Sequence, residues 1–338
     1  MFERFHLPAV RAQARWSLVG VADPRPERLA WVRTQIPSVL AECSLGPLLT
    51  RIQPDAVLIS SSPESHFAVA DEALRGGAHV LLEKPMVLQI AEARLLLDLA
   101  RSLNRHIRVG FNRRFRPAYL ELRARLKREH GGGLRSARFE LCSNPLGWSS
   151  VSSHLNQPDS SATLLQDLAS HQLDLVPWLV GENPSRLRAR WMQRDAQGTR
   201  IQIDLQFEGN LVASCLAGHV SGYVERLAID VAGRELLAGP GGIMRRGILP
   251  QALAYRILEG RSQSRAVAHK LMGRAGDTLS TFQRQLLAWA QAIDSPAAPE
   301  TSPAADGLAG ARSVALVNAS SRSLAADGAW VDTPDPYH

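Results

Sequence analysis

The chain has 338 residues, of which 45% are hydrophobic and 21% charged, so it is too apolar for disorder and long enough for two domains. The chain has only three cysteines, an odd number, which excludes a disulfide framework. They are widely spaced, which excludes any CxxC metal or redox motif. The net charge of +7 is scattered along the chain, no apolar run approaches a membrane span, and no secretory signal is evident, so we expect a cytoplasmic protein that binds neither nucleic acid nor membrane.

Apolar strands and helices alternate along the first part of the chain. We expect strands at 16–22, 55–60, 78–82 and 106–111, and helices at 26–33, 64–74, 89–103 and 117–130. Buried strands that alternate with helices are typical of a parallel sheet covered on both faces. The pattern therefore predicts an α/β domain of the nucleotide-binding type over residues 1–115.

The pattern changes after three consecutive glycines at 131–133. Period-two alternation then predicts strands at 186–191, 201–207, 211–219 and 226–231, with helices at 164–179, 278–293 and 307–324. The basic stretch at 239–276 fits no strand, and we interpret it as a helical insertion. We predict an α+β domain with an open, mostly antiparallel sheet over residues 116–338, and its closing helix is a candidate to pack back on the first domain.

Three polar segments follow predicted strands or lie on a predicted helix. Glu83-Lys84-Pro85 ends the third strand, at the sheet edge where α/β proteins bind ligands, and the proline can impose a cis peptide that aims the lysine. A surface Glu–Lys pair in a tight turn is the alternative. Asn112 and Arg114 follow the fourth strand, either at a cleft or in an ordinary strand-to-helix turn.

Asp167 and His171 are four residues apart on the predicted helix at 164–179, so their side chains would meet. A carboxylate next to an imidazole orients the ring and raises its basicity, as a general acid/base requires. Asp174 lies on the same face, three residues further along. A structural polar pair and a weakly supported metal site are the other interpretations.

Taken together and in this order, the segments resemble the Gfo/Idh/MocA oxidoreductase family over nearly the whole chain. The segments that carry the resemblance are HLPAV (6–10), VADPRPERL (21–29), SSPESH (61–66), GAHVLLEKP (77–85), VGFNRRFRP (109–117), DLASHQLDLVPWLVG (167–181) and DGLAGARSVALVNASSRS (306–323). The resemblance implies that the first domain is an α/β Rossmann-type domain that lacks its first strand. It also implies NAD(P)-dependent hydride transfer to or from a sugar-, polyol- or cyclitol-like substrate.

The resemblance also implies roles for individual residues. It implies Lys84, Asp167 and His171 as the catalytic residues, with His171 transferring a proton. It implies cofactor contacts from Asp23, Ser61, His66, Glu83, Lys84 and Asn112, and substrate contacts from Arg114, Trp148 and Asp174. A carboxylate at Asp23 repels a 2′-phosphate and favours NAD, whereas the nearby Arg25 keeps NADP as an alternative. We expect no metal.

One departure from the family pattern lies at the start of the sequence. The family opens with a strand and a GxGxxG-type loop, about a dozen residues before the segment matched by HLPAV. Met1 lies five residues before His6, so we interpret the glycine-rich strand and loop as missing, and expect the natural chain to start upstream.

Two other functions stay open. A truncated homologue, impaired in cofactor binding, would have a binding or regulatory role. Some members of the family cleave glycosides with the help of NAD, which makes a hydrolase the second alternative. In each case we expect a homodimer or homotetramer that associates through the open sheet.

Overall fold

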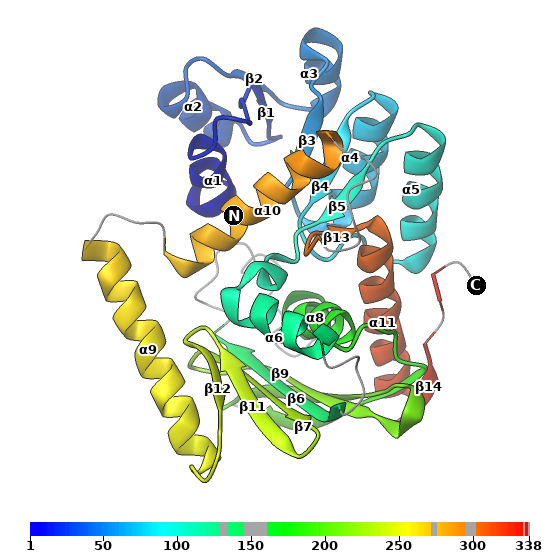
Figure 1. The fold of residues 1–338 in the computed structure, drawn as a ribbon. Coiled ribbons are helices and arrows are strands. Elements are labelled where there is room, and N and C mark those ends of the chain that lie inside the picture. The colour runs from blue at the N-terminus through cyan, green and yellow to red at the C-terminus, as the bar shows by residue number, and fades with distance from the viewer. Residues whose placement is uncertain are drawn as a thin grey trace. The chain divides into compact units, whose positions relative to one another are not determined.

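The computed structural model describes residues 1–128, 134–144, 161–195, 197–271, 276–294, 302–333 and 335–336 (Figure 1). It divides into two compact units. The first unit comprises residues 1–110 and 282–311, and the second comprises residues 111–281 and 312–338. No helix within the described ranges is both long and apolar enough to cross a bilayer.

The first unit alternates strands and helices, as the sequence predicted. Its elements are η1 (Phe2–His6), α1 (Leu7–Arg11), β1 (Gly20–Ala22), α2 (Pro26–Gln35), β2 (Leu40–Glu42), α3 (Leu45–Ile52), β3 (Ala56–Ile59), α4 (Pro63–Arg75), β4 (His79–Leu82), α5 (Ile90–Ser102), β5 (Ile107–Val109), most of α10 (Asp277–Asp294) and β13 (Ala305–Asp306). Strands β3, β4 and β5 pair in parallel, and β13 adds an antiparallel edge. Strands β1 and β2 form a separate parallel pair within the described residues.

The first unit differs from the predicted domain because α10 belongs to it. Phe5 stacks on Phe282 with ring centroids 5.0 Å apart, and Trp16 stacks on Trp289 at 4.7 Å. Phe282, Leu286 and Trp289 are spaced to share one helix face, and all are buried. This apolar face packs against the start of the chain, a long-range contact that no local sequence pattern predicts. The division after Gly110 also lies five residues before the predicted boundary.

The second unit is built on one eight-stranded sheet. Its elements are η2 (Asn112–Phe115), α6 (Pro117–Arg128), β6 (Leu134–Ser143), α7 (Ser161–Leu164), η4 (Leu165–Ala169), α8 (Ser170–Val180), β7 (Arg186–Asp195), β8 (Gly198–Gln206), η5 (Glu208–Asn210), β9 (Val212–His219), β10 (Val224–Val231), β11 (Arg234–Gly239), β12 (Gly242–Arg245), α9 (Gln251–Leu271), most of α11 (Gly307–Ala325) and β14 (Val331–Asp332). The strand order is β12-β11-β10-β6-β9-β8-β7-β14, and among the described strands of this sheet only β6 and β9 pair in parallel. The predicted open, mostly antiparallel sheet is therefore confirmed.

The two faces of this sheet have different chemistry. Helices α6 and α8 cover the inner face, where alternate residues of each strand are buried (Figure 1). On the outer face Asp204 accepts hydrogen bonds from Gln202, Ser214 and Arg188, at 2.8, 2.7 and 2.9 Å. Burial would raise the pKa of Asp204, but these hydrogen bonds and the Arg188 charge hold it below its usual value. The outer face of β7 and β8 is thus polar rather than apolar.

Several regions differ from their predicted structure. The strand expected at 16–22 is limited to β1, and η1, α1 and β6 had no prediction. The stretch at 239–276 includes the end of β11, strand β12 and helix α9, so it is only partly helical. Strand β2 and helix α3 had no prediction. Strand β2 has three residues, too few for a periodic pattern, and α3 contains Gly46 and Pro47, which usually mark turns.

Two histidines at the start of β4 and just before β5 make the first unit sensitive to acid. His79 and His106 stack with ring centroids 5.1 Å apart. Burial lowers the pKa of both, and the neighbouring Arg105 lowers both further. Since the folded-state pKa lies below the unfolded value of about 6.5, the free energy of unfolding should fall as the pH drops below that value.

Replacing His79 tests this sensitivity. The Nδ1 atom of His79 accepts a hydrogen bond from the His106 backbone N–H at 3.0 Å, and the side-chain oxygen of His79→Asn can take its place without titrating. Urea denaturation followed by circular dichroism should show a shallower loss of stability in the variant between pH 8 and pH 5. Equal slopes for the variant and the wild type would contradict the prediction.

Candidate active site

The turn that follows β4 holds the predicted catalytic lysine. Glu83, Lys84 and Pro85 come directly after the last strand residue, and the Lys84–Pro85 peptide is cis, as the sequence suggested. Strands β3, β4 and β5 are parallel, so this turn lies at the carboxyl edge of the sheet. That edge is where open α/β sheets place their ligands.

Glu83 is buried and held by His6. The Nε2–H of His6 donates to Glu83 Oε1 at 2.8 Å, and only 3% and 9% of the two side chains are exposed. Burial would raise the pKa of Glu83, but the hydrogen bond and charge of His6, together with the Lys84 charge, hold it below its usual value. The other carboxylate oxygen accepts the backbone N–H of Lys84 at 3.3 Å. Both oxygens of Glu83 therefore have protein donors.

His66, on α4, forms a hydrogen bond with the same turn. Its ring is fully buried, and its Nδ1–H donates to the Pro85 carbonyl at 2.8 Å. Its Nε2 lies 3.3 Å from the Ser61 carbonyl. Because the ring atoms of His66 and the oxygens of Glu83 face protein groups, the geometry gives both residues a positioning role. Direct cofactor contacts from either remain predictions.

Asp23 and Ser61 follow the first and third strands of the first unit. Asp23 receives two side-chain hydrogen bonds from Arg25, at 2.9 and 2.8 Å. The hydrogen bond and charge of Arg25 lower the pKa of Asp23. Ser61 is exposed, and its Oγ accepts the Ser65 hydroxyl at 2.7 Å. Asp23 thus offers a carboxylate whose charge a neighbouring guanidinium already balances.

The predicted acid/base pair lies in the second unit, on a helix with an irregular turn. Asp167 belongs to the π-helical turn η4, and His171 lies in the first turn of α8. Such π-turns inside helices frequently mark functional sites. The ring of His171 packs edge-on against Phe111, with ring centroids 6.4 Å apart. A second histidine, the buried His219 at the end of β9, places its Nε2 3.9 Å from Asp167 Oδ2.

Arg114 and Asp174 pair with each other rather than lining an open site. The Nε and Nη2 atoms of Arg114 donate to the two carboxylate oxygens of Asp174 at 2.8 and 2.5 Å. Both residues are more than nine-tenths buried. The guanidinium groups of Arg114 and Arg123 also lie over the Trp178 ring, and burial beside Arg114 lowers the pKa of Arg123 to about 10. Arg114 and Asp174 therefore form a buried ion pair, and their expected substrate contacts remain predictions.

Asn112 and Trp148 complete the predicted set. Asn112 Nδ2 donates to Thr281 Oγ1 at 3.2 Å within the second unit. Trp148 lies outside the described residues. Lys84 belongs to the first unit, and Asp167 and His171 to the second. That these three groups meet across one cleft remains a prediction.

Sequence reasoning missed a buried cluster beside Asn112. Glu225 on β10 accepts hydrogen bonds from Tyr119 at 2.8 Å and from Arg113 and Tyr223. Burial would raise the pKa of Glu225, but the charges of Arg113 and Arg116 lower it to about 2. This cluster ties η2 and α6 to the sheet. Arg113 and Tyr119 are 112 and 106 residues from Glu225 in the sequence, so no local spacing reveals the cluster.

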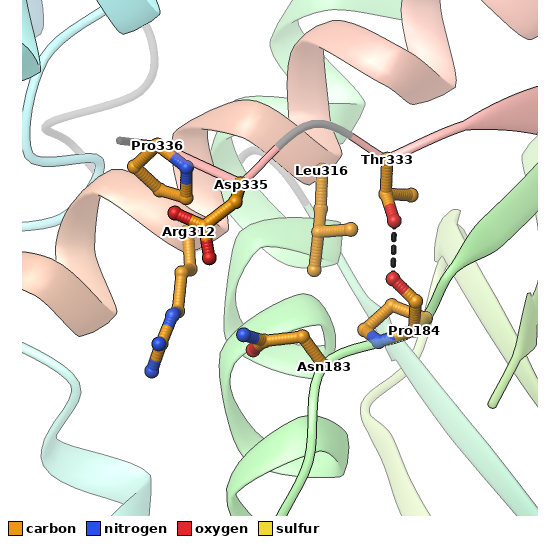
Figure 2. A pocket seen from close by; sticks show the side chains of 7 residues that line it. All are labelled: Asn183, Pro184, Arg312, Leu316, Thr333, Asp335 and Pro336. Atoms are coloured by element: carbon orange, nitrogen blue, oxygen red, sulfur yellow. Dashed lines mark hydrogen bonds between the residues drawn. The ribbon is translucent and has the colours of Figure 1, made fainter. Parts of the chain in front are cut away.

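The second unit also contains a small cavity, unrelated to the predicted catalytic residues. Its volume is about 70 Å³, and its lining residues are Asn183, Pro184, Arg312, Leu316, Thr333, Asp335 and Pro336 (Figure 2). Ligand pockets are usually about 300–1,000 Å³, so this cavity does not suit a polyol ring. Among the residues described, no three His, Cys, Asp or Glu side chains gather as a metal site requires.

The fold and these sites define a two-unit chain with a parallel-sheet unit of the dinucleotide-binding type. Residues 1–111 match the family model described as an oxidoreductase family with an NAD-binding Rossmann fold. Residues 119–236 match the model of the GFO/IDH/MocA C-terminal domain. The chain therefore belongs to the GFO/IDH/MocA family, which confirms the resemblance inferred from the sequence.

Several curated relatives match part of the chain. It is 34% identical to the putative oxidoreductase YceM of Salmonella typhimurium, over 52% of both chains. It is 31% identical to the UDP-N-acetylglucosamine 3-dehydrogenase of Acidithiobacillus ferrooxidans, over 55% of this chain and 53% of the relative. The inositol 2-dehydrogenase of Corynebacterium glutamicum is 31% identical, over 48% and 46%. These matches span about half the length of each relative.

Solved structures share the fold at lower identity. The scyllo-inositol dehydrogenase of Lactobacillus casei, solved with NAD(H) and scyllo-inositol, has a TM-score of 0.74 and 17% identity, covering 97% of this chain and 95% of that one. An oxidoreductase from Agrobacterium radiobacter, solved with NAD⁺, L-tartaric acid and magnesium, has a TM-score of 0.76 and 18% identity, covering 98% and 95%. At these identities the likeness shows the fold alone.

The Arg114–Asp174 pair predicts a pattern of stability changes. Asp174→Ala should lower the free energy of unfolding of the second unit by about 3–5 kcal/mol, because it leaves a buried guanidinium without its partner. The double variant Arg114→Met/Asp174→Leu should lose clearly less, since it removes both charges. Urea denaturation measures both. A stable Asp174→Ala protein that binds substrate poorly would contradict this prediction and would support a substrate contact for Asp174.

Proposed function

We propose that the chain is an NAD-dependent oxidoreductase that transfers a hydride between the nicotinamide and a carbinol carbon of a polyol, cyclitol or sugar derivative. The observation that carries the proposal is the Lys84 turn, held by two buried histidines at the carboxyl edge of a parallel sheet in a chain of this family. Family relatives that oxidise inositol or a nucleotide sugar support the substrate class.

The residues present suit a dinucleotide. Asp23 supplies an acceptor for ribose hydroxyls after β1, and Ser61 supplies an exposed hydroxyl after β3. Lys84 lies in the turn after β4, which is next to β3 in the same sheet. When bound, the nicotinamide supplies or accepts the hydride. The polar groups after these strands would hold and orient the cofactor.

The remaining chemistry falls to three side chains. His171 takes the hydroxyl proton when the substrate is oxidised and returns it in reduction. Asp167 orients the imidazole and balances its positive charge. The Lys84 ammonium group stabilises the negative charge that develops on the substrate oxygen. This mechanism requires Lys84 and His171 to face one substrate.

The relatives reported above favour hydride transfer over the other two candidate functions. They are dehydrogenases or oxidoreductases, which supports neither NAD-assisted glycoside hydrolysis nor a purely regulatory role for this chain. We further propose that the protein works in the cytoplasm; its three cysteines carry free thiols. We also propose self-association through the eight-stranded sheet, because α9 covers the outer face at its β10–β12 end, within the part of the chain that the structure describes.

The catalytic assignment is tested with myo-inositol, scyllo-inositol and UDP-N-acetylglucosamine, each with NAD and with NADP. At least one should give reduced cofactor, measured by absorbance. His171→Ala should then lower turnover by roughly 10²–10⁴-fold, while NAD affinity changes little. Asp167→Asn should cost less, because it leaves the imidazole in place. Full activity in His171→Ala would remove this residue from the mechanism.

The Asp23–Arg25 pair predicts how the chain chooses its cofactor. Arg25→Ala leaves the carboxylate charge unbalanced, so NADP binding should weaken relative to NAD by about tenfold, or roughly 1.4 kcal/mol. Asp23→Ala frees the guanidinium for a 2′-phosphate and should shift the preference the other way. Isothermal titration calorimetry with both cofactors measures the ratio of the two affinities. Arg33→Ala in α2, the helix that follows Arg25, is the control. An unchanged ratio in both variants would contradict the assignment.

A further inference from the structure

The pair of His6 and Glu83 lies directly before the proposed catalytic lysine. We propose that His6 is a positioning residue of this oxidoreductase, which acts through Glu83 to fix the backbone and amine of Lys84. The inference rests on the function proposed above, in which Lys84 faces the substrate. It assigns a role to a side chain 77 residues from its partner.

The ring of His6 has little freedom to move. Its residue is 2% exposed, and its edge packs on Phe282 with ring centroids 5.0 Å apart and an interplanar angle of 88°. Phe5 stacks on the same phenylalanine. The two aromatic contacts set the direction in which the Nε2–H of His6 points. That direction leads to the carboxylate of Glu83.

Glu83 is confined on its other side as well. Its Oε2 accepts the backbone N–H of Lys84, so the carboxylate bridges His6 and the lysine. A Cβ atom on Gly110 would lie 2.9 Å from Oε2 and 3.1 Å from the Glu83 Cα. Only glycine at position 110, directly after β5, leaves room for the Glu83 carboxylate. The carboxylate therefore has one arrangement among its described neighbours.

A buried carboxylate is costly unless it is paired, and an apolar residue would fill the same space at lower cost. The position of the pair suggests why it is kept. Glu83 holds the amide on one side of Lys84, and His66 holds the Pro85 carbonyl on the other. The lysine is thus fixed at both of its chain neighbours, with a negative charge beside it.

Four variants test the proposal. His6→Leu removes the donor, and His6→Gln keeps a side-chain N–H that can take the place of Nε2. Glu83→Gln removes the charge at constant shape. His79→Asn is the control, because it changes a half-buried histidine at the start of β4, the other end of that strand.

The kinetic arm uses whichever polyol or nucleotide sugar the wild type oxidises. His6→Leu should lower turnover by roughly 10–10²-fold, the scale of a misplaced catalytic group, with the Kd for NAD within about twofold of wild type. His6→Gln should recover most of the turnover, and His79→Asn should match wild type. Equal turnover in His6→Leu, or a loss of NAD binding that accounts for its whole defect, would overturn the proposal.

The second arm needs no activity, so it separates failure of this inference from failure of the proposed function. The chain has three lysines, Lys84, Lys127 and Lys270, and reductive methylation with ¹³C-formaldehyde gives each a resolvable NMR signal. The charged groups that act on Glu83 are His6, Lys84 and the Met1 α-amino group. Loss of the His6 donor releases the Glu83 carboxylate from its place beside Lys84, and Glu83→Gln removes its charge, so the Lys84 NMR signal should shift relative to wild type in both variants.

The other lysine signals and the His79→Asn spectrum serve as internal references. The Lys127 signal should lie where it does in wild type in every variant. A Lys84 signal that is the same in His6→Leu and wild type would overturn the proposal, whether or not a substrate has been found. If His6→Leu does not fold, Glu83→Gln gives the same readout.

Discussion

The hydrogen bond between His6 and Glu83 is the interaction on which the proposed site depends. It keeps a buried carboxylate ionised one residue before Lys84, and it ties the start of the chain to the end of β4. The aromatic contacts of Phe282 set the direction of that bond, so α10 also contributes to the position of the lysine. The proposed catalytic lysine at the end of β4 is in this way supported by elements from both ends of the first unit.

The second unit uses buried charge for the same purpose. The Arg114–Asp174 pair and the Glu225 cluster fasten the residues that follow Gly110 to α8 and to β10. Each removes polar groups from water, and each is satisfied by several partners, as buried charge requires. These contacts hold the segment that carries Asn112 against α8 and β10. Asp167, in contrast, lies on a π-turn with His219 beside it.

Sequence reasoning predicted what depends on local patterns. The alternation of strands and helices, the cis peptide before Pro85 and the helix that carries His171 all have signals within a few residues. It did not reveal pairings between residues that are distant in the sequence: His6 and Glu83 are 77 residues apart, and Arg114 and Asp174 are 60 apart. A polar residue near a predicted site looks the same in sequence whether it faces a ligand or a buried counter-charge. The π-turn leaves no compositional trace either.

The polar outer face of β7 and β8 has a consequence for how copies of the chain could associate. With Asp204 at the centre of a network of arginine, glutamine and serine side chains, this face keeps its water more tightly than an apolar one. An interface formed there would retain ordered water and depend on charge complementarity rather than on buried apolar area. Ionic strength, more than temperature, would then control assembly, because salt screens exposed charges over about 10 Å at 0.1 M.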